Sequence, residues 1–248
     1  MTYPMAAALV VAILVAGLAL GGGALRADNV ERQKLALAGG LLVSAWAVIV
    51  IFAAMGPPHL ATLSENKLRY PLILMDAIAI AGGLLVLREA LSGAGERLFS
   101  TLCSVAIVFA TPLYIVFCAV QLGVYRAVER AGSEQAAAEI TSLDEVSLIL
   151  LFVGVMLTYL ATAAAALALA RIRWLGRIAS RVIMGVSLFA LLCVAVRMAE
   201  ALASTQNPLW GFSQWYSLPG FILAIPAVPW IMPCFIGVVL LRRASAEQ

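Results

Sequence analysis

The sequence predicts an all-α integral membrane protein, a bundle of seven transmembrane helices with the N-terminus outside and the C-terminus in the cytoplasm. Of its 248 residues, 64% are hydrophobic and only 12% are charged, whereas soluble domains are about half apolar and a quarter charged. Seven apolar stretches of about 20 residues, the length that crosses ~30 Å of hydrocarbon, make up most of the chain. The distribution of arginine and lysine predicts the orientation.

Each apolar stretch is expected to form a helix, because backbone groups in lipid must be satisfied within their own segment. The stretches leave only short loops, so a single transmembrane domain is expected over residues 1–248. In chain order, the predicted helices are Met5–Leu25, Leu35–Met55, Leu68–Leu87, Phe99–Val124, Leu143–Ala170, Val182–Ala203 and Pro219–Leu241.

The first stretch is longer than the apolar region of a signal peptide, and no lysine or arginine precedes it. We therefore expect it to be retained as a helix.

The first three helices are expected to pack closely near their cytoplasmic ends. Gly21–Gly23, Gly39–Gly40 and Gly82–Gly83 lie toward the same side of these helices. Small residues allow helix backbones in membranes to approach one another.

The fifth and seventh helices carry the clearest local signals. Ser142 and Glu145 have the spacing of a capping box, which predicts a helix start near Leu143, after a short separate outer helix over Gln135–Ile140. In the seventh stretch Pro226, Pro229 and Pro233 surround Trp230. Interior prolines remove backbone hydrogen bonds and kink helices, so we interpret this segment as a cavity lining or a hinge.

The positive charges favour one side of the predicted bundle. Eleven of the 16 lie on the side that holds the C-terminus, four lie on the other side, and Arg197 falls within a helix. Because positively charged loops stay in the cytoplasm, the richer side is predicted to be cytoplasmic. Its members are Arg26, Arg32, Lys34, Arg88, Arg97, Arg171, Arg173, Arg177, Arg181, Arg242 and Arg243.

Three ionisable residues fall inside predicted helices, namely Asp76, Arg197 and Glu200. Such groups cost about 2.5–3.5 kcal/mol each to insert and are functional candidates by default. Counted from the outer helix ends, Asp76 and Arg197 are predicted at the same depth, which suggests an ion pair that Glu200 could join. The alternative is a ligand or ion site that also includes Gln121 and Tyr114.

An outer aromatic belt is predicted beside this intramembrane polar cluster. Trp210, Trp215 and Tyr216 lie between the sixth and seventh helices, at the level where aromatic side chains meet lipid headgroups. Together with the cluster they outline a cavity that opens outward.

The missing residue types argue against cofactors and catalysis. The only histidine, His59, lies in a predicted loop, which excludes bis-histidine haem and a histidine-built metal centre in the membrane. The seventh stretch has no lysine to hold retinal. No motif for serine or zinc hydrolysis or for phosphate binding is present. Bound lipid or quinone remains open, and no nucleic-acid partner is expected.

Three hypotheses about function follow from these observations. The first is a non-catalytic accessory or structural subunit of a larger membrane complex. The second is a small transporter that uses the outer polar cluster, and the third is a seven-helix receptor for a small apolar ligand. Alanine-rich helices and a preference for arginine over lysine favour the inner membrane of a bacterium.

Overall fold

A computed structural model describes residues 29–44, 62–130, 134–203 and 228–246 of the chain. Within these ranges it contains six α-helices, one short 3-10 helix and no strand. In chain order, the elements are α2 (Val30–Val43), α4 (Leu63–Gly93), α5 (Leu98–Arg130), α6 (Glu134–Arg171), α7 (Arg177–Ala203), η2 (Val228–Trp230) and α9 (Ile231–Ala246). The all-helical prediction is thus confirmed for the part of the chain that the structure describes.

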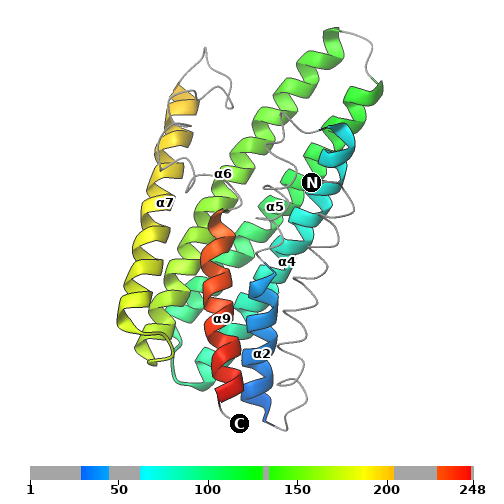
Figure 1. Cartoon of the computed structure of the whole chain (residues 1–248). Helices are drawn as coiled ribbons and strands as arrows, with labels where there is room; N and C mark the ends of the chain where they lie inside the picture. The colour runs from blue at the N-terminus through cyan, green and yellow to red at the C-terminus, as the bar shows by residue number, and fades with distance from the viewer. Residues whose placement is uncertain (1–28, 45–61, 131–133, 204–227, 247–248) are drawn as a thin grey trace.

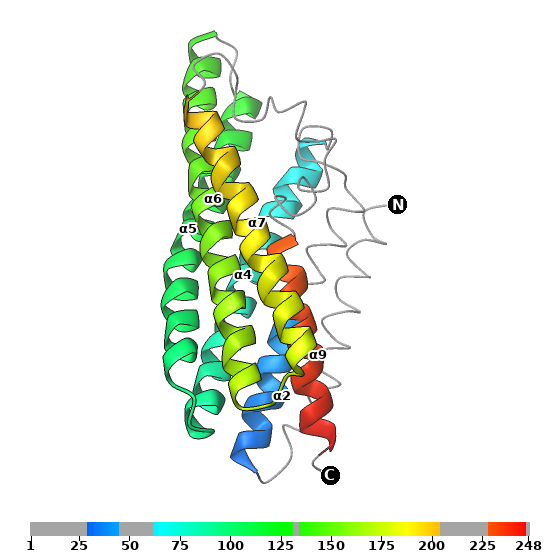
Figure 2. The same ribbon diagram turned by 90° about the vertical axis from the view of Figure 1, so that its left-hand side faces the viewer.

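The helices pack mostly against their neighbours in a continuous series (Figure 1). The order of contact is α9, α2, α4, α5, α6 and α7, and the α5–α6 interface is the most extensive. Figure 2 shows the same arrangement from the side, with α7 in front of α6. Because η2 and α9 also contact α6, the two C-terminal elements lie against the interior of the bundle.

Four helices, α4 to α7, are long and apolar enough to cross a membrane. They correspond to the predicted spans three to six, and their length and composition indicate a membrane protein. The first predicted helix, Met5–Leu25, lies outside the described residues. The second and seventh predictions are described only in part, by α2 and α9, so the count of seven and the orientation of the termini stay predictions.

Several predicted boundaries were wrong, and local sequence explains each difference. Helix α4 begins at Leu63 rather than Leu68, because Thr62 and Glu65 form a reciprocal capping box. Helix α6 is continuous from Glu134, so Ser142 lies within it and no separate outer helix precedes it. The intervening residues include three consecutive alanines and no glycine or proline, which favours an unbroken helix.

Glycines bring α2 close to two other helices. An alanine Cβ placed at Gly83 of α4 would lie 2.9 Å from Leu42 Cγ of α2. On the other face of α2, a Cβ at Gly39 would lie 2.9 Å from the carbonyl oxygen of Gly237 in α9. The predicted close contact between the second and third helices is confirmed, whereas the contact of Gly39 with α9 was not predicted.

Candidate functional site

The five residues of the predicted intramembrane polar cluster are distributed over several helix interfaces. Asp76 lies in α4, Tyr114 and Gln121 lie in α5, and Arg197 and Glu200 lie in α7. Four of them are described with their side chains, and each of these four is buried. The side chain of Glu200 lies outside the described residues.

Asp76 faces the end of α2. Its Oδ1 lies 3.0 Å from Ser44 Oγ, which is also 2.5 Å from the Leu41 carbonyl oxygen. Because α4 begins at Leu63, Asp76 lies about 20 Å along this helix at 1.5 Å per residue, close to its middle. The sequence had placed it nearer the outer end.

Arg197 faces a different neighbour. Its guanidinium carbon lies 5.5 Å from the ring centroid of Phe152 in α6, a cation–π geometry. Arg197 is only about 9 Å from the end of α7 at Ala203. Asp76 and Arg197 thus contact different neighbours and form no ion pair with each other, and α5 and α6 stand between their helices in the packing series.

The other two members of the cluster join α5 to α6. Gln121 Nε2 donates to Ser147 Oγ at 2.7 Å. Tyr114 Oη and Thr158 Oγ1 lie 2.9 Å apart, and Thr158 Oγ1 donates to the Gly154 carbonyl at 2.8 Å. Since a threonine hydroxyl has one proton, Tyr114 is the donor to Thr158. Both contacts connect the two most extensively packed helices.

The prolines of the seventh stretch mark a helix start. Pro229 lies within η2, and Pro233 is the third residue of α9, where no intrahelical N–H bond is lost. Trp230 is fully buried, with its ring centroid 5.5 Å from that of Tyr114. In the described part of this stretch the prolines thus lie before or within the first turn of a regular helix. Pro226, Trp210, Trp215 and Tyr216 lie outside the described residues.

Sequence reasoning missed a buried arginine near the other end of α4. Arg69, near the start of the third predicted helix, was counted among the four positive charges of the outer side, but it lies inside α4 and is fully buried, and Asn66 one turn earlier is also buried. The capping box of Thr62 and Glu65 was the available signal, since it places the helix start before both residues.

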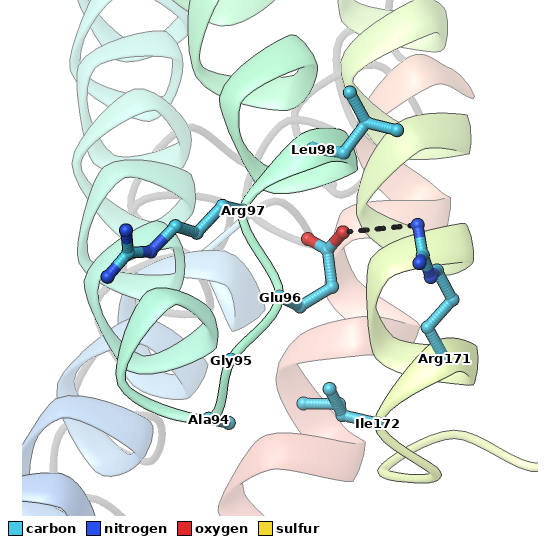
Figure 3. A pocket seen from close by; sticks show the side chains of 7 residues that line it. All are labelled: Ala94, Gly95, Glu96, Arg97, Leu98, Arg171 and Ile172. Carbon is cyan, nitrogen blue, oxygen red and sulfur yellow. Dashed lines mark ion pairs between the residues drawn. The ribbon is translucent and has the colours of Figure 1, made fainter.

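Sequence reasoning also missed a cavity of about 380 Å³. It lies at the end of the bundle where α4, α6 and α9 end and where arginines are most frequent, called the basic end below. It lies where the α4–α5 turn meets the end of α6 (Figure 3). The buried Glu96 accepts hydrogen bonds from the backbone N–H groups of Phe99 and Ser100, at 3.1 and 2.9 Å, and so caps α5. Arg171 reaches Glu96 from α6 at 3.9 Å. The lining residues are Ala94, Gly95, Glu96, Arg97, Leu98, Arg171 and Ile172.

The four long apolar helices indicate a polytopic α-helical membrane protein. Comparison of the chain with protein-family models, with curated proteins and with solved structures found no match. Among the described residues, no three histidine, cysteine, aspartate or glutamate side chains lie close enough together to hold a metal ion. The arguments about function therefore rest on the contacts above.

Asp76→Asn is expected to change the free energy of unfolding by less than about 1 kcal/mol, because the amide can donate to or accept from the Ser44 hydroxyl and removes a buried ionisable group. Ser44→Ala, which removes the same hydrogen bond, is expected to cost about 0.6 kcal/mol. Unfolding in mixed detergent micelles measures both. A loss above about 2 kcal/mol for Asp76→Asn would instead indicate an ionised carboxylate with a buried counter-charge.

Proposed function

We propose that this protein is a non-catalytic subunit that supports or assembles a larger complex in the membrane. The observation that carries the proposal is the use of its buried polar side chains. Tyr114 and Gln121 hydrogen-bond to α6, and Asp76 hydrogen-bonds to the end of α2. Residues that could have formed a solute site thus hold neighbouring helices together, as polar residues commonly do in membrane bundles.

Helix α6 is central to this proposal. It packs against α5 on one side and α7 on the other, and its alanine-rich second half is almost entirely buried. On the α7 side, Ser180 Oγ donates to the Ala166 carbonyl at 2.9 Å and Phe152 holds the Arg197 guanidinium. These contacts support a rigid scaffold whose outward faces on α5 and α7 are apolar.

Charge distribution supports a proposed orientation. The starts of α2, α5 and α7 and the ends of α4, α6 and α9 lie at one end of the described bundle (Figure 1). Arginines dominate this end, and by the positive-inside rule we propose that it faces the cytoplasm. With seven helices the N-terminus would then be outside, and the composition favours a bacterial inner membrane.

Site-specific photocrosslinking in native membranes tests the proposal. One photoreactive residue is placed at an exposed position on each of four helices, Met75 of α4, Phe109 of α5, Leu192 of α7 and Phe235 of α9. The buried position Leu84 is the control, because it contacts only this chain. A defined protein adduct from one face, absent at Leu84, is expected. Adducts to lipid alone from all four faces would contradict the proposal.

A proton or cation transporter is the second candidate, and Asp76 favours it. This carboxyl lies near the middle of α4 beside the last carbonyl groups of α2, and helix ends of this kind coordinate ions in transporters. In proteoliposomes with a trapped pH dye, transport would appear as proton uptake under an imposed potential that Asp76→Asn abolishes. Equal uptake by both proteins, at the level of empty liposomes, would remove this candidate. The receptor hypothesis stays a prediction.

A further inference from the structure

We propose that the cavity at the basic end of the bundle binds the phosphate of an anionic phospholipid headgroup, and that Arg171 is the cation that holds it. The proposal concerns a binding site separate from the intramembrane side chains discussed above. It rests on the position of one guanidinium, the lining of the cavity and the location of the cavity at the ends of the membrane spans.

The Arg171 guanidinium is oriented before any ligand arrives. One of its nitrogens lies 3.9 Å from Glu96 Oε1, and its central carbon lies 5.4 Å from the Phe99 ring centroid. Its side chain is nevertheless 57% exposed. A guanidinium presents five N–H donors in a planar fork. The donors that do not face Glu96 can therefore bind a phosphate with little further loss of side-chain freedom.

Glu96 does not oppose such a ligand as strongly as an isolated carboxylate would. Its side chain is only 3% exposed, and both of its oxygens accept backbone N–H groups at the start of α5. The positive end of the helix dipole further offsets this charge. Glu96 thus serves to position Arg171, and the outward face of the cavity remains cationic.

The location of the cavity favours a lipid over a soluble anion. The candidate spans of α4, α5 and α6 have ends at Gly93, Leu98 and Arg171; Leu98 and Arg171 line the cavity, and Gly93 directly precedes the lining residue Ala94. Leu98, which is 68% exposed, and Ile172 supply an apolar wall for the glycerol and first acyl carbons. Basic residues at the same end attract anionic headgroups. They include Arg88, Arg97, Arg173, Arg177, Arg181, Arg242 and Arg243.

Arg97 provides a matched control. It also lines the cavity and is exposed, but in Figure 3 its side chain extends away from Glu96 and Arg171. A general attraction between the basic end and anionic lipid depends equally on both arginines. A phosphate site at Arg171 depends much more on that residue.

Lipid titration of the purified full chain by native mass spectrometry tests the proposal, with phosphatidylglycerol as the probe and phosphatidylcholine as the neutral reference. Arg171→Gln is expected to weaken phosphatidylglycerol binding about fivefold, because one basic residue near the membrane surface contributes about 1 kcal/mol to the binding of anionic lipid. Arg97→Gln is expected to weaken it less than about twofold. An unchanged melting temperature would show that both variants fold. Equal effects of the two substitutions, or none from Arg171→Gln, would overturn the proposal.

Inorganic phosphate distinguishes the two sources of the ligand. If the cavity holds a lipid, adding millimolar phosphate at constant ionic strength is expected to leave phosphatidylglycerol binding unchanged. Displacement of the lipid by phosphate from the wild type but not from Arg171→Gln would show a site for a soluble anion and would overturn the assignment to lipid.

Discussion

Gly237→Ala is expected to destabilise the bundle by about 2–3 kcal/mol, although it adds only one methyl group. The new Cβ would lie 2.8 Å from the Gly39 carbonyl oxygen, 2.9 Å from Leu42 Cβ and 3.0 Å from the Val43 nitrogen. Two of these are backbone atoms of α2 and cannot rotate away. Helix α9 must therefore move off α2, which gives up the close packing that holds membrane helices together.

Gly185→Ala is the matched control for this substitution. Gly185 lies inside α7 and is exposed, and a Cβ there would meet nothing within 4 Å. Alanine is the better helix former by up to about 1 kcal/mol, so this variant is expected to be as stable as the wild type or slightly more stable. Unfolding in mixed detergent micelles compares the two. Equal stabilities of both variants would show that α2 and α9 do not meet at Gly39 and Gly237.

Trp230→Ala is expected to cost about 3 kcal/mol. The Trp230 side chain is fully buried beside Tyr114, at the point where η2 leads into α9. Because lipid is as apolar as the protein interior, little of this loss comes from the transfer of apolar surface. It comes from the cavity that the missing indole leaves and from the dispersion contacts that are lost with it.

Trp174→Ala is the control that separates the effect of burial from the effect of losing any tryptophan side chain. Trp174 is half-buried at the basic end, and its ring lies 4.8 Å from the Arg243 guanidinium carbon. Its removal is expected to cost no more than about 1 kcal/mol, the size of an exposed cation–π contact. The same unfolding measurement applies. If Trp174→Ala proved as costly as Trp230→Ala, the burial of Trp230 would not be the cause of its effect.

Apolar length predicted the spans well because the bilayer imposes a single requirement on every spanning helix. The predicted spans three to six correspond to α4 to α7. Starts and interruptions were less predictable, since they depend on capping and on residue preference. Thr62 with Glu65 is a cap in the structure, whereas the similar pair Ser142 and Glu145 lies inside a helix.

Partners across the bundle could not be predicted from one sequence. Polarity within the apolar stretches identified Asp76, Arg197, Gln121 and Tyr114 as residues of interest, and all four are buried. Their contacts depend on which helices are neighbours, and hydropathy carries no information on neighbours. Ser44 and Thr158, the hydroxyl partners of Asp76 and Tyr114, were indistinguishable in the sequence from other small polar residues in apolar stretches.

The glycines show what a composition argument can and cannot provide. Gly82–Gly83 correctly indicated a close approach of the second and third helices, whereas Gly39 faces α9. The same reasoning gave no prediction for Gly237, because it used clusters of two or three glycines and Gly237 is a single glycine. Only the structure shows that the carbonyl of Gly39 lies against Gly237.

Native mass spectrometry of the protein, extracted gently from its own membranes, tests the proposed role most directly. A subunit of a larger complex is expected to carry a second polypeptide at fixed stoichiometry. Asp76→Asn is expected to leave this complex intact, because Asp76 is proposed to act only within the chain. A lone, stable chain that carries a reproducible small extra mass would contradict the subunit proposal and would indicate a protein that binds a ligand by itself.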